Sequence, residues 1–239
     1  WINTLATYVF PTIGHKQVTE LRASDFADAL RPIWLSKPER ASRVRQRCDT
    51  VMNWCAARDY IVASPLPAVT QLLPRQPGKR ERQQHHPAVP WQDVPNFVCT
   101  VLREKRSTTA KRALEFVILT AARSGEVRGM VWREINLDQA IWTIPAERMK
   151  AKMIHRVPLS ERAHAILIEQ KGDLPVESDL VFPSNRNKPL SDMTLTKVLR
   201  DAGVPSDTPG RIATVHGFRS SFRDWASENG YSRDIAERA

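Results

Sequence analysis

The sequence predicts a mainly α-helical protein of two domains, the second of which also carries a small antiparallel β-sheet. Apolar residues recur at helical spacing over much of the chain, whereas three short segments in the second half look like strands. A stretch with four prolines and no apolar periodicity separates the two parts. With 239 residues, 41% of them hydrophobic, the chain can bury a core in each part. We therefore predict domains at 1–75 and 88–239, joined by a basic linker at 76–87.

Three helices are predicted in the first domain. We expect one over 1–10, ended by Pro11, and a second over 24–34 with Ser24 as its N-cap. The third is expected over 38–58, because its leading proline suits a first helical turn. Its buried stripe is predicted from apolar residues spaced four, three and four apart: Val44, Cys48, Val51 and Cys55.

Positive charge dominates the chain and is concentrated in its first part. The net charge is +10 and the isoelectric point about 9.9. Residues 1–90 carry 13 basic and 7 acidic side chains. This balance favours a polyanionic partner over a basic protein that has none.

Four arginines of the third helix are candidate contacts to nucleic acid. Arg40, Arg43 and Arg47 share a face beside the buried stripe, and Arg45 lies on the other flank. Arginines so placed can lie along a phosphate backbone, although a solvated helix face explains the pattern equally well. Lys79 and Arg80 make the linker basic, so we expect it to cross a groove of DNA.

The histidines of the linker are expected to be ordinary linker residues. His85 and His86 have no cysteine or histidine partners at the spacing of a metal site.

The second domain is predicted to begin with a helix entry at 90–93 and a strongly apolar helix over 108–122. Ser124 and Gly125 are expected to interrupt it, and a short helix over 126–130 to follow. The predicted strands are 134–137, 141–144 and 155–159. The later helices are predicted over 160–170 and 191–202, each capped by its first serine, and over 216–228, with Gly230 just beyond the end.

Cysteine content and hydropathy indicate an environment without disulfides or membrane. Cys48 and Cys55 are seven residues apart on one predicted helix, which separates them by roughly 10 Å, too far for a disulfide. We expect reduced, buried thiols in a cytoplasmic protein. No apolar run approaches the roughly 18 residues of a membrane helix, and no signal peptide is visible. The chain opens at Trp1 without a methionine, so we expect an N-terminal piece to be missing.

Arg123 is the first candidate for chemistry. It lies in the segment TAARSGE at the predicted helix break, beside the free N–H groups of the next helix. A phosphate could bind there. From this segment alone, an ion pair of Arg123 with Glu126 or Glu115 is the favoured alternative.

Two further motifs carry cationic side chains. Lys150 lies in the predicted hairpin, where a lysine can reach a bound backbone, although most lysines in such turns are solvated charges. His216 and Arg219 are three residues apart and share a helix face. Together they can act as proton donor and anion clamp, but an isolated HxxR motif is common.

The sequence has none of the usual motifs for metal-dependent phosphate chemistry. It contains no His/Cys/Asp cluster at metal spacing, no glycine-rich phosphate loop and no run of carboxylates. We expect phosphodiester chemistry here to use fixed protein cations, which argues against a metal-dependent nuclease.

Taken in order, three segments resemble the catalytic domain of tyrosine recombinases, in particular prophage and genomic-island integrases: TAARSGE, RMKAKMIHRVPLS and TVHGFRSSFRDWASENGY. Residues 1–75 resemble the helical core-DNA-binding domain of that family, and 88–239 its mixed α+β catalytic domain. The resemblance implies a site-specific DNA recombinase that integrates or excises a mobile element, such as a viral genome, through a covalent 3′-phosphotyrosine.

The resemblance also implies roles for individual residues. Arg123 matches the first catalytic arginine, Lys150 the hairpin lysine, with Lys152 as the second choice, and His216 with Arg219 the HxxR pair. No cofactor is implied. The implied partners are double-stranded attachment-site DNA, three further copies in a tetramer, and accessory DNA-bending or excision factors. The implied location is the bacterial cytoplasm, at the nucleoid.

The match fails at the nucleophile. The family places a tyrosine well downstream of the HxxR helix, yet the tyrosines of this chain are Tyr8, Tyr60 and Tyr231. The last follows Gly230 at a predicted turn, too early to match, and we interpret it as structural. We therefore expect the nucleophile to be missing from this chain. A noncatalytic DNA-binding protein of the same fold, such as a degenerate integrase or a regulator, stays the alternative.

Overall fold

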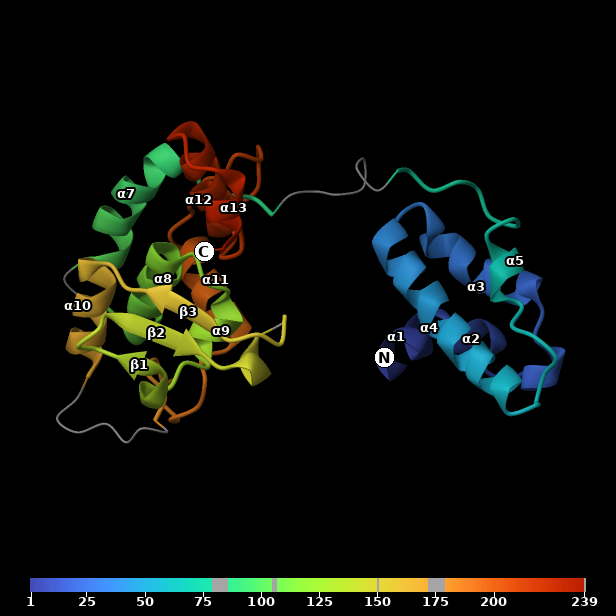
Figure 1. Ribbon diagram of the computed structural model, residues 1–239. Coiled ribbons are helices and arrows are strands. Elements are labelled where there is room, and N and C mark those ends of the chain that lie inside the picture. The colour runs from blue at the N-terminus through green and yellow to red at the C-terminus, as the bar shows by residue number, and fades with distance from the viewer. Residues whose placement is uncertain (79–85, 105–106, 150, 172–178, 239) are drawn as a thin grey trace. The chain divides into compact units, whose positions relative to one another are not determined.

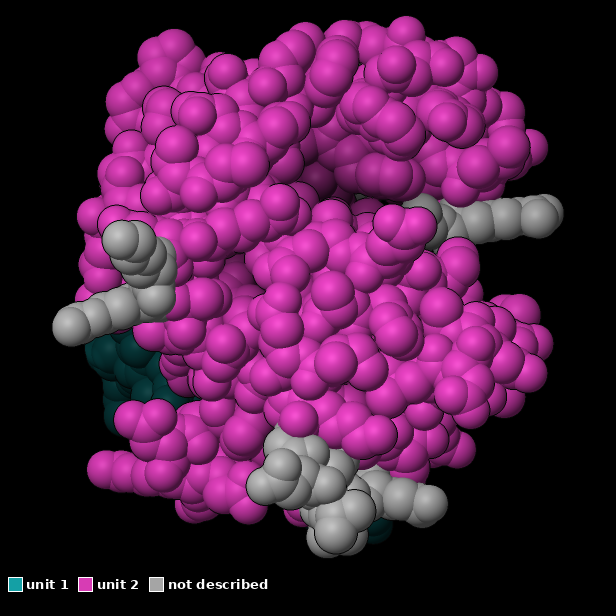
Figure 2. Space-filling view, turned by 90° about the vertical axis from the view of Figure 1, so that its left-hand side faces the viewer, with its two compact units in different colours: residues 1–84 teal, residues 85–239 magenta. Residues whose placement is uncertain are grey.

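The computed structural model describes residues 1–78, 86–104, 107–149, 151–171 and 179–238 (Figure 1). The chain forms two compact units, Trp1–Gln84 and His85–Ala239, here called unit 1 and unit 2 (Figure 2). Each has its own cluster of buried apolar side chains. The predicted class, mainly helical with one small antiparallel sheet, is confirmed.

The described residues of unit 1 form helices joined by turns and loops, with no strand. Its elements are α1 (Ile2–Tyr8), α2 (Phe10–Ile13), the 3-10 turn η1 (Val18–Glu20), α3 (Ala23–Trp34), α4 (Pro38–Ala57) and α5 (Leu66–Val69). Helices α3 and α4 pack against each other and both contact α5. Leu30, Val44 and Leu66 are fully buried between them.

Three local predictions in unit 1 were wrong. Pro11 does not end the helical region, because it occupies the first turn of α2, where no N–H is needed. Ser24 is not the cap of α3; the Asp25 carboxylate accepts the Arg22 N–H at 2.9 Å. Val51 is 41% exposed, and Met52 takes its place in the core at 2%.

The two cysteines of α4 are buried and free, as predicted, and burial raises the pKa of the Cys48 thiol to about 11. Cys99 of unit 2 is also free but exposed, contrary to the expectation of buried thiols.

The described elements of unit 2 pack around an apolar helix, Thr109–Thr120. Its helical elements are η2 (Trp91–Asp93), α7 (Val94–Phe97), the π-turn η3 (Val98–Leu102), α8 (Thr109–Thr120), α9 (Ser124–Arg128), η4 (Trp132–Glu134), η5 (Ala146–Arg148), α10 (Glu161–Gln170), α11 (Asp192–Asp201), α12 (Gly217–Glu228) and α13 (Arg233–Arg238). Helix α8 contacts α9, α10 and α11 (Figure 1). Its Phe116 ring packs against Trp142 of the sheet, with the ring centroids 5.7 Å apart. The core of the unit therefore centres on α8.

The sheet has the order β1-β2-β3 and is antiparallel throughout. Its strands are β1 (Ile135–Asn136), β2 (Ile141–Ile144) and β3 (His155–Pro158), close to the predicted ranges. Trp142 pairs with Val157, and both side chains face the core. The turn η5 follows β2, so the hairpin that joins β2 to β3 is long.

Helix ends in unit 2 mostly follow the predicted signals. The Ser160 hydroxyl accepts the Ala163 N–H and begins α10. Gly230 has a φ of +79°, as a residue just past the end of α12 requires. Ser191 precedes α11 but caps no backbone N–H, because its hydroxyl bonds to Thr194 at 2.9 Å.

One buried acid holds α8 to its neighbours. Glu115 is 1% exposed and accepts hydrogen bonds from Arg103 at 2.8 Å and Arg162 at 2.9 Å. Burial alone would raise the pKa of this carboxyl, but the two guanidinium groups hold it below its usual value.

Within the described ranges, no helix is both long and apolar enough to cross a membrane.

Candidate functional site

The turn between α8 and α9 positions the first candidate residue. Helix α8 ends because Ala121 adopts the left-handed conformation, with a φ of +50°. That conformation costs an L-residue about 1–2 kcal/mol. The chain then re-enters a helix with Arg123 as the N-cap. The predicted interruption at Ser124 and Gly125 was therefore misplaced, since both residues belong to α9.

Arg123 is held by Glu126 on the next turn. Its guanidinium donates to one carboxylate oxygen at 2.7 Å, and its backbone N–H donates to the other at 2.9 Å. The predicted alternative of a Glu126 pair is thus present, while Glu115 binds other arginines. The Arg123 side chain is still 44% exposed. Within the described part of the chain, its Nε and Nη2 groups have no protein acceptor.

Arg219 comes to the same place from α12. Its guanidinium donates to the carbonyl oxygen of Ala121, two residues before Arg123. Burial, followed by the charge of Arg123, lowers the pKa of Arg219. The two candidate arginines therefore flank one turn of chain.

His216 is the N-cap of α12, on the face that also carries Arg219. Partial burial lowers the pKa of its imidazole, and the nearby charges of His86, Arg219, Arg123 and Arg223 lower it further. The structure thus gathers three of the four predicted catalytic residues; their catalytic roles stay a prediction.

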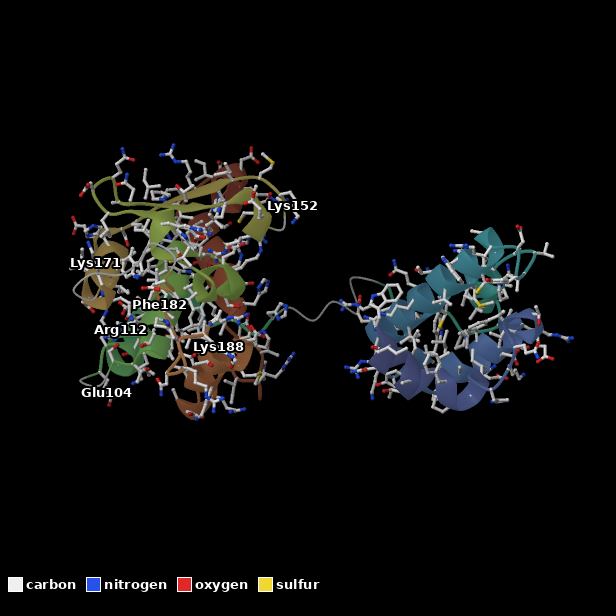
Figure 3. The ribbon with its side chains drawn as sticks, turned by 90° about the horizontal axis from the view of Figure 1, so that it is seen from below. Glu104, Arg112, Lys152, Lys171, Phe182 and Lys188 are labelled. Atoms are coloured by element: carbon white, nitrogen blue, oxygen red, sulfur yellow. The ribbon has the colours of Figure 1, made fainter. Side chains whose placement is uncertain are left out.

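Lys150, the fourth predicted catalytic residue, lies outside the described residues. Lys152, the second choice, is exposed on the β2–β3 hairpin with a φ of +55° (Figure 3). The hairpin base is anchored by Arg148, which donates to both carboxylate oxygens of Glu134 and to the Glu126 carbonyl. The Trp142 indole donates to the same Glu134 carboxylate at 3.0 Å.

The role of Arg148 was not predicted from the sequence, because charged residues in a turn are usually solvated. In the structure Arg148 joins the hairpin to α9, whose side chain at Glu126 holds Arg123. The hairpin and the first candidate arginine therefore share one hydrogen-bonded network.

Residues 86–89, here called the strap, run across the start of α12. The Pro87 carbonyl accepts from the Thr214 N–H at 2.9 Å and from the Thr214 hydroxyl at 3.2 Å. Ala88 donates to Asp207 at 3.0 Å and accepts from the Asp207 N–H at 2.9 Å. The Val89 carbonyl accepts from the Ser221 hydroxyl.

The strap also carries a ring to the candidate site. The His86 imidazole meets His216 edge to face, with centroids 4.5 Å apart. His86, expected from the sequence to be a linker residue, therefore also contacts the candidate site. Its contact partner lies 130 positions away, and no local pattern marks it. His85 lies outside the described residues.

Gly217 lets the strap approach α12 closely. A Cβ at this position would lie 2.1 Å from the Pro87 carbonyl oxygen and 2.8 Å from Ala88 Cα. Real Cβ atoms do not approach backbone atoms so closely, so any side chain at 217 must displace the strap.

Each tyrosine of the chain contacts a neighbouring side chain within its own unit. Tyr231 follows the end of α12, as expected, and packs against Trp225 with the ring centroids 5.2 Å apart. Tyr8 accepts a hydrogen bond from Arg40 in unit 1, and Tyr60 packs against Trp54.

The predicted DNA-contacting arginines of unit 1 form a concave cluster. Arg40, Arg43 and Arg47 line one depression with Thr4 and Glu39. The contacts of the cluster are Arg40 to the Tyr8 hydroxyl at 3.0 Å, Arg47 to Thr4 at 2.6 Å and Arg43 to Glu39 at 3.7 Å. Arg45 is half-buried on the same helix. Lys79 and Arg80 lie outside the described residues.

No group of three or more metal-ligating side chains occurs among the residues that the structure describes.

Comparison with known families and structures identifies the chain. Residues 91–239 match the family model described as the phage integrase family, and residues 1–71 match that of the phage integrase central domain. The chain belongs to the phage integrase family.

Two curated relatives of this integrase-family chain are the integrase of Enterobacteria phage P4 and the prophage integrase IntZ of Escherichia coli. The first is 30% identical over 99% of this chain, and the second 33% identical over 98%. The chain spans 56% of the length of each.

Solved integrases have the same fold at low sequence identity. The Tn1549 transposon integrase in complex with circular intermediate DNA gives a TM-score of 0.72 at 10% identity, covering 99% of this chain and 82% of that one. The lambda integrase tetramer bound to a Holliday junction gives 0.71 at 17% identity, covering 99% and 69%.

We predict that Gly217→Ala destabilises unit 2 by about 1–3 kcal/mol, because the added methyl group collides with the strap backbone. Thermal and urea unfolding measure the effect. Gly125→Ala is the matched control, since its Cβ would meet its nearest neighbour, Arg128, at 3.9 Å. Equal stability of the two variants would contradict the close approach.

We also predict that Arg148→Met costs roughly 3–5 kcal/mol, because it leaves the buried Glu134 carboxylate without its cation. Urea denaturation measures the loss, and adding Glu134→Gln to the variant should restore part of it. The exposed Arg133→Ala serves as control. A stability loss for Arg148→Met no larger than for this control would show that the network contributes little.

Proposed function

We propose that this chain is the DNA-clamping and catalytic part of a site-specific recombinase that integrates or excises a mobile element through a covalent 3′-phosphotyrosine. The observation that carries the proposal is the convergence of Arg123, His216 and Arg219 around one turn, in a chain of the phage integrase family. These side chains come from segments almost a hundred residues apart, so their assembly is a property of the fold.

The chemistry needs fixed positive charge. The tyrosine hydroxyl gives up its proton as its oxygen attacks the phosphorus, the bond from phosphorus to the 5′-oxygen breaks, and the leaving 5′-oxygen takes up a proton, so the step consumes no net proton. Negative charge grows on the non-bridging oxygens in the transition state, where Arg123 and Arg219 can donate paired hydrogen bonds. Lys150 is the proposed general acid, and His216 assists proton transfer. The covalent bond conserves the phosphodiester energy, so neither a cofactor nor ATP is needed.

We propose that the nucleophilic tyrosine lies outside these 239 residues. Tyr8 and Tyr60 belong to unit 1, and the half-exposed Tyr231 packs against Trp225 just past α12. The greater length of the curated relatives supports this assignment. The 239-residue chain alone is therefore expected to bind DNA without cutting it.

Residues 1–75 are proposed as the core-DNA-binding domain and 76–87 as a basic linker that crosses a groove, with its last two residues, His86 and Pro87, lying in the strap on unit 2. The Arg40/Arg43/Arg47 cluster, with Arg45 beside it, would contact phosphates, and Lys79 with Arg80 would extend these contacts. The proposed catalytic domain is 88–239.

The proposed partner is double-stranded attachment-site DNA, bound by four copies. The lambda integrase tetramer on a Holliday junction, which shares this fold, supports that assembly. Accessory DNA-bending or excision factors and a location at the bacterial nucleoid complete the proposal.

The complete protein tests the proposal directly. With a nicked suicide substrate it should form a covalent protein–DNA adduct. If no adduct forms although the DNA is bound, the noncatalytic alternative replaces this proposal.

We predict that Arg123→Ala in the complete protein lowers cleavage by roughly 10²–10³-fold, while DNA affinity changes little, because phosphate contacts elsewhere carry binding. Adduct formation and a mobility-shift titration measure the two effects separately. Arg200→Ala, at the exposed end of α11, is the control. Equal losses of affinity and cleavage would contradict a transition-state role for Arg123.

We predict salt-sensitive duplex binding by the 239-residue chain, because it carries a net charge of +10. The triple variant Arg40→Ala/Arg43→Ala/Arg47→Ala should reduce the slope of log K against log salt by up to about 2.7, at roughly 0.9 for each phosphate that is no longer neutralised. Arg31→Ala on α3, which pairs with Asp28, is the control. An unchanged slope in the triple variant would exclude the cluster as the clamp.

A further inference from the structure

His216 has little besides packing to hold its ring. Although it occupies the N-cap position of α12, it makes no side-chain capping bond. Within the described part of the chain, neither of its ring nitrogens has a protein hydrogen-bond partner. A histidine that moves a proton must nevertheless keep one nitrogen aimed at the reacting atom. Some other contact must therefore orient the imidazole.

The His86 ring provides that contact. It lies edge to face against the His216 ring, with centroids 4.5 Å apart and an interplanar angle of 68°. Aromatic pairs favour this geometry because the positive ring edge faces the negative ring face. Both side chains are exposed, so the contact favours one orientation of the His216 ring, because rotation about its χ2 angle breaks the edge-to-face packing.

His86 is itself held by a rigid backbone. It directly precedes Pro87, and the residue before a proline is restricted to extended conformations. The Pro87 carbonyl is fixed by two bonds from Thr214, and Pro87, Ala88 and Val89 are buried. Thr214 is two residues before His216. The strap therefore ties His86 to the segment that carries its partner ring.

We infer that His86 is a positioning residue for the candidate active site, acting by holding the His216 imidazole in its working orientation. The effect on catalysis rests on the proposed function, whereas the contact between His86 and His216 does not. His86 is not proposed to touch DNA or the reacting atoms.

The charged groups around His216 indicate how the loss of His86 would change the pKa of His216. Those facing it are His86 from the strap, Arg123 from the α8–α9 turn, and Arg219 with Arg223 from α12. Partial burial and these groups lower its pKa, which favours a neutral ring with one nitrogen free to accept a proton. Removing His86 takes away part of the burial and one of the charges. The pKa of His216 should then rise toward its ordinary value.

The first experiment needs no cleavage activity. Side-chain NMR spectra of the histidines in the 239-residue chain are recorded against pH for the unaltered protein, His86→Ala and His86→Phe. His86→Ala should raise the pKa of His216 and broaden its ring signals. His86→Phe keeps an aromatic ring without a charge, so it should retain sharp signals. His15→Ala, an exposed histidine of unit 1, is the matched control.

The second experiment measures cleavage by the complete protein on the suicide substrate. His86→Ala should slow adduct formation by roughly tenfold, a fraction of what general acid–base catalysis contributes, with unchanged DNA affinity. It should also shift the pH profile upward on its acid side. His86→Phe should restore most of the rate.

The outcomes separate the two claims. Unchanged His216 signals in His86→Ala overturn the positioning contact, whatever the activity. Altered signals with an unchanged rate and pH profile show a contact without a catalytic consequence, which also overturns the inference. If the unaltered complete protein forms no adduct, the proposed function fails, while the NMR result still decides whether His86 orients His216. Because His86 is exposed, both variants are expected to fold, and circular dichroism checks this.

Discussion

The candidate site depends on fixed acceptors that hold like charges beside one another. Arg123 and Arg219 repel each other, and the charge of Arg123 contributes to the lowered pKa of Arg219. The Glu126 carboxylate, only 7% exposed, binds one guanidinium, and the Ala121 carbonyl binds the other. That carbonyl is available because Ala121 takes a left-handed conformation and ends α8. The left-handed Ala121 and the buried Glu126 thus hold two arginines close together. Without these acceptors, repulsion would move the two side chains apart.

The same acid links the site to the rest of unit 2. Glu126 uses its side chain for Arg123 and its backbone carbonyl for Arg148, which in turn binds Glu134 below the hairpin. Because each partner is satisfied by the next, the network acts as a unit, and losing one member leaves a buried charge unpaired. The geometry of the first arginine and of the hairpin base is therefore set together.

The sequence was informative where local rules decide the structure. Strand 141–144, the Ser160 cap and the Gly230 turn follow from alternation, capping and glycine conformation. The motifs around Arg123, His216 and Arg219 indicated a cationic site, and the fold brings those residues together.

Prediction failed where distant contacts decide. An alanine at positive φ leaves no trace in composition, so the end of α8 was placed too late, at Ser124 and Gly125. Val51 and Met52 both fit a helical stripe, because spacings of three and four are equally allowed, and only packing selected Met52. Arg148 and the strap depend on partners far along the chain.

The strap also determines which residues a separately folded unit 2 must include. The family model matches from residue 91, yet three residues before that point fill space against α12. A catalytic unit cut at residue 91 would lose the strap, leaving the Thr214 N–H without the Pro87 carbonyl as its acceptor and Gly217 without the backbone that covers it. To keep these contacts, a catalytic unit has to begin no later than His86.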